Sequence, residues 1–236
     1  MARRFFCLLL CLGGLSAAPA HAAAPVLLTT ALERWHVGEG EWAFTQQTRV
    51  YHSDGTLKEE RIERYDPSLP DSQRWRLVEL NGQPPTEAQK ATVDTRKNAK
   101  PRRKPGKGPA DLLDLEHASL VGDSPKTARF KIAFRPDVSH FVDLDEVEVV
   151  VAVDKESGTI SGVGATLREP MRVLLGLARI TNLDVDLHLA MVDEGSPHEE
   201  NDIQSGSTAR VKISKLGRPV EYDWSDFKRV PAFAGP

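Results

Sequence analysis

The chain has 236 residues, of which 28% are charged and 40% are hydrophobic, and its formal net charge at pH 7 is −3. This mildly acidic balance gives no support to nucleic-acid binding, which depends on clustered lysine and arginine. The length is enough for one domain with a sizeable core.

The first 22 residues have the features of a cleaved secretory signal. Arg3 and Arg4 precede an unbroken apolar run over residues 5–12, and Ala20-His21-Ala22 fits the small-residue pattern that a signal peptidase cuts. The run is too short to span a hydrocarbon layer of about 30 Å. We therefore expect residues 1–22 to be a signal peptide and the mature protein to be exported.

Cleavage would remove both cysteines, Cys7 and Cys11. Because disulfides are the usual staples of small exported domains, a mature chain without cysteine must rely on its core alone. Removing Arg3 and Arg4 from the 31 basic residues leaves 29 against 34 acidic residues, a net charge of −5. We expect one domain over residues 23–236 and a monomeric protein.

A short helix and three strands are the first elements expected after the signal. Leu28, Leu32 and Trp35 recur at helical spacing, which predicts an amphipathic helix over residues 25–36. Asp54-Gly55 between two alternating segments is a strong signal of a tight hairpin turn. The alternation of apolar and polar residues predicts strands over 42–52, 56–65 and 74–80.

The middle of the chain has a different composition. Thr86 and Gln89 are spaced as in a capping box, which predicts a helix that ends near Asn98. A basic insert rich in proline and glycine follows over about residues 96–107, and a second short helix is predicted over residues 109–116.

Strand patterns resume from Thr127 to the end of the chain. The segment from Val147 to Val153 is apolar on both faces in its second half, as is typical of a central strand. Gly158 ends a turn that starts at Lys155, which indicates a further hairpin. The other strands expected here cover 127–135, 159–167, 183–191, 209–215 and 220–224.

About nine strands with short connections require antiparallel neighbours. The fold class that we predict is α+β, mainly β, with one strongly curved antiparallel half-barrel sheet and helices packed on its concave face. A closed lipocalin-like barrel is the alternative, but it would not explain helices large enough to cover one side of the sheet.

Three stretches carry a family resemblance: Trp42-x-Phe44-Thr45-Gln46 after the first helix, Arg74-Trp75-Arg76-Leu77 before Asn81-Gly82, and the ending from Tyr222-Asp223 to Phe227-Lys228-Arg229-Val230. Together they resemble the LolA-like superfamily of periplasmic lipoprotein carriers and outer-membrane lipoprotein-sorting proteins, over roughly residues 25–230. The resemblance implies a periplasmic protein in which an open half-barrel and a helical lid hold acyl chains between them. The arginine that latches the lid of the transport carriers is not carried over, because Arg64 is followed by Tyr65 instead of proline.

No motif in the sequence points to catalysis or to a metal. The histidines of the mature chain are isolated, and His198 lacks the second histidine of a zinc-binding helix. There is no Gly-x-Ser-x-Gly nucleophile motif, and the glycines around Ser161 lack the lysine of a phosphate loop. We therefore expect a protein that is not an enzyme and that needs no cofactor or metal.

Ten apolar side chains are assigned to the concave face of the sheet. They fill an ordinary core, or they line a partly open cavity that holds acyl chains; the sequence leaves both interpretations open. The second makes the protein a periplasmic lipid- or lipoprotein-binding carrier, whereas the alternative is an envelope protein that acts through protein–protein contacts. The ten residues are Trp42, Phe44, Trp75, Leu77, Phe130, Ile132, Phe134, Val185, Leu187 and Leu189.

The basic insert also has two interpretations. It is a solvated loop, as charge runs usually are, or it contacts anionic lipid headgroups, with roughly 1 kcal/mol for each basic residue near such a surface. In the second case Arg102, Arg103 and Lys104 make the contact. The partners that we expect are thus a lipid or acylated protein and an anionic membrane surface.

Overall fold

The computed structural model describes residues 25–35, 42–99, 109–137, 144–173, 178–189, 207–215 and 217–231. The predicted signal peptide lies outside these residues. In the described part of the chain, no helix is both long enough and apolar enough to cross a membrane.

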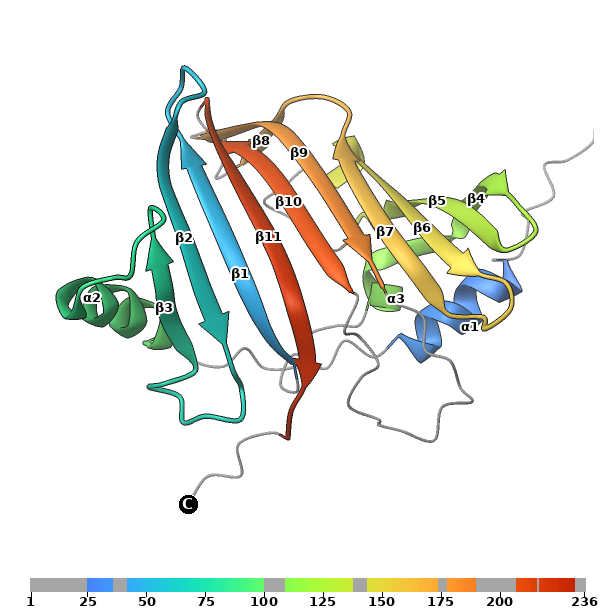
Figure 1. Cartoon of the computed structure of the whole chain (residues 1–236). Coiled ribbons are helices and arrows are strands. Elements are labelled where there is room, and N and C mark those ends of the chain that lie inside the picture. Colours follow the sequence, from blue (N-terminus) through green and yellow to red (C-terminus); the bar gives the residue numbers. More distant parts are fainter. Residues whose placement is uncertain are drawn as a thin grey trace, which may run out of the picture.

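The fold is one open antiparallel sheet with helices at its two ends (Figure 1). The strand order is β3-β2-β1-β11-β10-β9-β7-β6-β5-β4, and β8 pairs with β9 beside this path. The strands are β1 (Trp42–Tyr51), β2 (Leu57–Tyr65), β3 (Trp75–Leu80), β4 (Leu113–Asp123), β5 (Thr127–Phe134), β6 (Val147–Asp154), β7 (Ile160–Leu167), β8 (Met171–Val173), β9 (Ala178–His188), β10 (Thr208–Lys215) and β11 (Arg218–Arg229). The helices are α1 (Val26–Arg34), α2 (Glu87–Asn98), α3 (Pro109–Leu112) and a 3-10 turn, η1 (Leu144–Glu146). The predicted mainly β class with antiparallel pairing is confirmed.

The hairpins form where the turn residues predict them. Gly55 has a φ of 85°, and its N–H donates to the carbonyl of His52 at 3.0 Å, which closes the turn between β1 and β2. Asn81 and Gly82 after β3 both have positive φ, as does Gly158 between β6 and β7. Such backbone conformations favour glycine and asparagine, so local chemistry sets these connections.

The strand β4 corrects the prediction of a helix over residues 109–116. The helix stops at Leu112, and Leu113 pairs with Phe134 at the start of an eleven-residue strand. The register between β4 and β5 shifts between Asp114 and Ser119, which interrupts the period of two. A bulge of this kind hides a strand from pattern analysis.

Two predicted strands are longer in the structure, and one short strand was not predicted. The strand expected over 183–191 begins at Ala178, where it pairs with the short strand β8. The strand expected over 220–224 runs from Arg218 to Arg229, with an irregularity in register near Asp226, whose φ is 54°. The described residues thus form eleven strands, and the expected number of nine is too small.

The buried core lies at one end of the sheet, between α1 and the strands β4 to β7. Leu28 and Leu32 of α1 are buried, and Trp35 packs beside them, which confirms the predicted apolar stripe. Alternate residues of β6, from Val147 to Val153, are at most 5% exposed. Figure 1 shows α1 at this end of the sheet, far from α2.

At the other end, α2 lies along the outer edge of β3 (Figure 1). It begins with the predicted capping box between Thr86 and Gln89. The Asn98 side chain accepts from the N–H of Trp75 at 2.8 Å and donates to its carbonyl at 3.0 Å, and Asp94 accepts from the N–H of Leu77 at 2.9 Å. The helix therefore satisfies backbone groups that an edge strand otherwise leaves open to further pairing.

The turn after β6 should make stability sensitive to acid. The Asp154 carboxylate accepts from the N–H groups of Ser157 at 2.9 Å and Glu156 at 3.0 Å. The hydrogen bond from Ser157 is the main reason that the pKa of Asp154 lies below its usual 3.8. Its contribution is therefore present above that value and is lost as the pH falls below it.

In thermal unfolding, Asp154→Ala should lower stability at pH 7 by about 1 kcal/mol, the usual value of lost turn hydrogen bonds. Asp154→Asn, which still accepts hydrogen bonds but does not titrate, should keep most of the stability and lose part of the decline between pH 4 and pH 2. An identical acid profile for Asp154→Asn and the unchanged protein would show that this carboxylate does not contribute.

Candidate functional site

One face of the sheet presents a continuous series of apolar side chains from β11 to β6. The strand registers place Leu187, Ala209 and Trp224 opposite one another on β9, β10 and β11. The same row continues through Val163 and Val151 into the core. We call the central part of this face the apolar face, formed by Leu183, Val185, Leu187, Ala209, Val211, Ile213, Val220, Tyr222 and Trp224.

The apolar face is only half-buried, unlike the core beside it. None of its nine residues falls in the buried class. Leu183 packs against the core cluster, whereas Val211 and Tyr222 are outside that cluster. The two larger helices lie at the ends of the sheet, α1 on the core and α2 on β3 (Figure 1). The described residues thus leave this stretch less well covered than the two ends.

The ten apolar residues predicted to line one cavity are distributed along the sheet. Phe130 and Ile132 are buried in the core, and Phe134 and Leu189 pack against it. Val185 and Leu187 belong to the apolar face. The remaining four, Trp42, Phe44, Trp75 and Leu77, come from β1 and β3 near α2. The structure therefore separates a filled core at one end from aromatic residues at the other.

The aromatic residues near α2 form one cluster. The ring of Phe44 stacks on Tyr65 with centroids 4.9 Å apart and meets the edge of Trp75 at 5.6 Å. Tyr65 and Trp75 are also 4.9 Å apart, and Phe227 approaches Phe44 at 5.8 Å. Aromatic pairs at these separations stabilise one another beyond the area that they bury.

A buried polar group lies between this aromatic cluster and the apolar face, and the sequence analysis missed it. Glu63 is 1% exposed, and its Oε2 accepts from Nε2 of Gln46 at 3.3 Å. Gln46 Nε2 also donates to Thr48 Oγ1 at 2.8 Å, and Gln46 Oε1 accepts from Trp224 Nε1 at 3.2 Å. Lys97 of α2 completes what we call the polar cluster, with Nζ 3.0 Å from Glu63 Oε2.

Lys97 belongs to the predicted basic insert but is not merely a solvated charge. Besides the ion pair with Glu63, its Nζ lies 4.0 Å from the ring centroid of Trp75, a cation–π arrangement. The insert is therefore anchored to the fold at its first residues. The three residues expected to contact an anionic surface, Arg102, Arg103 and Lys104, lie outside the described residues.

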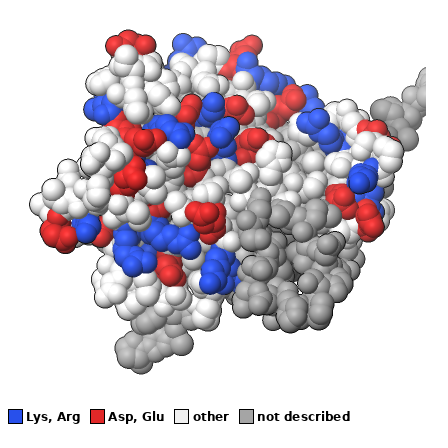
Figure 2. Space-filling model, viewed as in Figure 1, with Lys and Arg blue, Asp and Glu red and all other residues white. Residues whose placement is uncertain are grey.

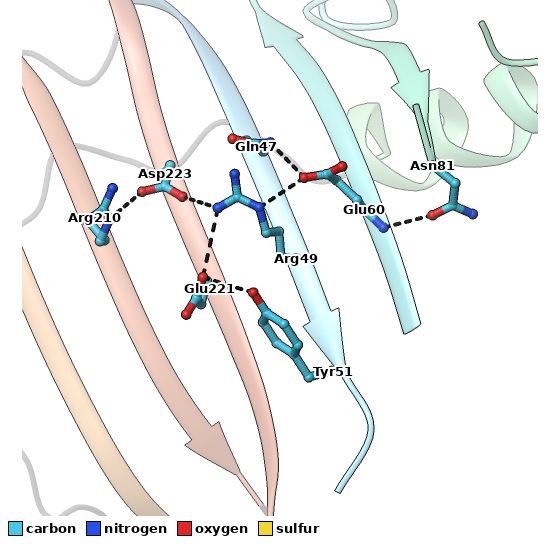
Figure 3. Close-up of polar contacts among 8 residues, drawn as sticks. All are labelled: Gln47, Arg49, Tyr51, Glu60, Asn81, Arg210, Glu221 and Asp223. Carbon is cyan, nitrogen blue, oxygen red and sulfur yellow. Dashed lines mark hydrogen bonds and ion pairs between the residues drawn. The ribbon is translucent and has the colours of Figure 1, made fainter. Parts of the chain in front are cut away.

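The opposite face of the sheet carries charges of alternating sign (Figures 2 and 3). Arg49 on β1 bonds Glu60 on β2 at 2.9 Å and Asp223 on β11 at 2.8 Å. Arg210 on β10 bonds the other oxygen of Asp223 at 2.6 Å. Tyr51 donates its hydroxyl to Glu221 at 3.1 Å. We call this surface the charged face.

Two groups of this network, Arg49 and Tyr51, have shifted pKa values. Burial opposes the charge of Arg49, but hydrogen bonds and attraction to Glu60 and Asp223 outweigh it and raise the pKa of Arg49. Burial, followed by the hydrogen bond to Glu221, raises the pKa of Tyr51. A network of partly exposed ion pairs satisfied in this way has the features of a solvated outer face.

Removing the central arginine should weaken the sheet only moderately. Arg49→Gln should lower the free energy of unfolding by about 1 kcal/mol, because the pairs are partly exposed but form a network. The loss should shrink in 1 M salt, which screens the repulsion left among Glu60, Glu221 and Asp223. Lys212→Gln, which removes one pair of 3.5 Å to Glu221, is the matched control and should cost less. Equal losses at low and high salt would contradict an electrostatic role.

Within the described residues, no three histidine, cysteine, aspartate or glutamate side chains are grouped so that they could hold a metal ion.

Comparisons with known proteins give no family. No protein-family model matches the chain, and no curated protein matches it. A solved structure, that of the Pseudomonas aeruginosa MucA/MucB complex, aligns over 87% of this chain and 98% of its own chain, with 14% identity and a TM-score of 0.19. A TM-score this low identifies neither a shared fold nor a function.

Proposed function

We propose that this protein is a carrier-like protein of the periplasm that binds the acyl chains of a lipid or of a lipoprotein on its apolar face. In this proposal the sheet is the wall of a LolA-like half-barrel. The helices α1 and α2 lie at the ends of the bound chains. The charged face points to solvent.

The observation that carries the proposal is the difference in burial along one continuous apolar surface. Alternate residues of β6 are at most 5% exposed, as expected of a finished core. The residues in register with them on β9, β10 and β11 are apolar too, yet they stay half-buried. Contiguous apolar surface that a protein leaves accessible is typical of an interaction site.

Acyl binding needs no special polar chemistry, which agrees with a sequence that lacks motifs. Each buried methylene contributes about 0.8 kcal/mol, so a stretch of about ten carbons could supply roughly 8 kcal/mol before the entropy cost of association. Trp224 and Tyr222 add large, rigid contact surfaces, which stack 5.7 Å apart on β11.

The test is to place the same substituent on each face of one strand. Val211→Gln puts a polar group on the apolar face, whereas Lys212→Gln changes the neighbouring residue on the charged face. We expect Val211→Gln to weaken the binding of palmitate by about tenfold or more, because it removes apolar contact and buries an amide. Lys212→Gln should bind palmitate as the unchanged protein does.

Equal palmitate affinities for both variants would refute the proposed site. Mass spectrometry of gently extracted protein gives a second test, because a lipid should remain bound. Recovery of a protein partner, with no lipid and no palmitate binding, would instead favour an envelope protein that acts through protein–protein contacts.

A further inference from the structure

The polar cluster lies in the same cross-strand row as the apolar face. Glu63 is opposite Gln46, and Gln46 is opposite Trp224. From Trp224 the row runs on through Ala209 to Leu187. An amphipathic molecule whose chain lies across the strands along this row would therefore bring its polar end to Gln46 and Glu63.

The length of the row suits such a ligand. Four strand spacings separate Leu187 on β9 from Glu63 on β2, which is about 19 Å at the usual distance between neighbouring strands. The apolar part, from Leu187 to Trp224, covers two of these spacings, about 10 Å, which is comparable with an extended chain of about eight carbons; the polar part covers the other two. The apolar part of the row ends at Trp224, whose indole N–H donates to Gln46 and so marks the change from apolar to polar lining.

One atom of the polar cluster is unsatisfied. Glu63 Oε2 has Gln46 and Lys97 as partners, but Oε1 is buried and has no hydrogen-bond partner among the described residues. A buried carboxylate oxygen without a donor is costly, so native structures usually supply one. The chemistry that fits it is a hydrogen-bond donor, and a cationic donor forms the strongest bond.

The helix that carries Lys97 is attached to the sheet through polar contacts. No residue of α2 is buried, and Asp94, Lys97 and Asn98 hold it by polar contacts. Elements with few buried contacts open at low free energy. Movement of α2 away from β3 is thus the route by which a ligand group would reach Oε1.

We propose that the polar cluster is the headgroup site of the bound lipid and that it selects a primary ammonium, as in an ethanolamine headgroup, through Glu63 Oε1. This inference rests on the proposed acyl-chain binding. The ammonium donates a hydrogen bond to Oε1, and the ion pair between Lys97 and Oε2 re-forms when α2 returns to β3. A quaternary ammonium, which has no N–H, cannot make this bond.

The test uses dioctanoyl phosphatidylethanolamine and its N-monomethyl, N-dimethyl and N-trimethyl derivatives, which share chains and phosphate. Calorimetric titration of the unchanged protein should give an affinity for the ethanolamine lipid about tenfold above that for the trimethyl lipid. Because one N–H is enough for the bond to Oε1, the largest fall in affinity should come between the dimethyl and the trimethyl lipid. Glu63→Gln should remove the preference, whereas Glu60→Gln, on the charged face of the same strand, should keep it.

Each outcome separates this inference from the function on which it rests. Equal binding of all four lipids, or tighter binding of the trimethyl lipid, would overturn the headgroup site and leave acyl binding intact. Binding of none of the four would overturn the proposed function itself. Free phosphoethanolamine, which has no chains, should not compete at the same concentrations; effective competition would overturn the assignment to a lipid.

Discussion

Phe130→Ala should lower the free energy of unfolding by about 3–5 kcal/mol, the range for removing a buried phenylalanine. Phe130 is 4% exposed and lies in the core cluster, opposite Val151 of β6. The substitution removes apolar contacts within the core cluster and leaves a cavity there. Urea unfolding followed by circular dichroism would measure the loss.

Leu120→Ala is the matched control for this substitution. Leu120 is opposite Phe130 on the neighbouring edge strand β4, but it is 54% exposed. Because water already covers much of this side chain, its truncation should cost less than about 1 kcal/mol. Similar losses for the two variants would contradict the placement of the core between α1 and β4 to β7.

Lys97→Met should also be strongly destabilising, by about 3 kcal/mol, because it leaves the Glu63 carboxylate buried without its cation. The value is at the lower end of the usual range because Lys97 is 20% exposed while Glu63 is 1% exposed. Hydrogen exchange should accelerate at the N–H groups of Trp75 and Leu77, since these bond to side chains of the same helix.

Glu63→Gln in the Lys97→Met background should recover most of the lost stability, because a neutral amide needs no cation. Lys90→Met is the control on the same helix, since Lys90 pairs with Glu87, which is 90% exposed. It should change the free energy of unfolding by less than about 0.5 kcal/mol. A loss for Lys97→Met no larger than that for Lys90→Met would show that the ion pair does not hold α2.

Features that depend on neighbouring residues could be predicted from the sequence. The turns at Gly55, Gly82 and Gly158 and the capping box of α2 use residue types that are suited to one backbone conformation each. Apolar residues on both faces of β6 indicate a central strand, and β6 does pair with β5 and β7. For the same reason, the antiparallel sheet was predictable, because short connections allow no other pairing.

Features that depend on distant partners could not be predicted in this way. The strand β4 has a register irregularity that breaks its alternation, and only its pairing with β5 makes it a strand. The pairing of Glu63 with Lys97 joins residues on β2 and α2, and nothing in the local sequence distinguishes them from other surface charges. Glu63 stands between Ile62 and Arg64 in a polar strand, and a carboxylate in such a position is usually solvated.

The sequence could group the ten apolar residues on one surface, but it could not predict how deeply each of them is buried. The sequence assigned ten apolar residues to one surface, because alternation reveals which side chains share a face. It could not show that Phe130 and Ile132 would be buried in the core cluster while Val185 and Leu187 stay half-buried. It also left out Val211 and Tyr222, because the position of β10 and β11 in the middle of the sheet follows from long-range pairing.

Photo-crosslinking with a palmitate analogue that carries a diazirine in its chain tests the central proposal most directly. The account predicts saturable adducts at every second residue of β10 and β11, on Val211, Ile213, Tyr222 and Trp224, with excess palmitate suppressing them. Labelling of Lys212 and Asp223 on the charged face at equal yield, or no saturable labelling of β9 to β11, would contradict it.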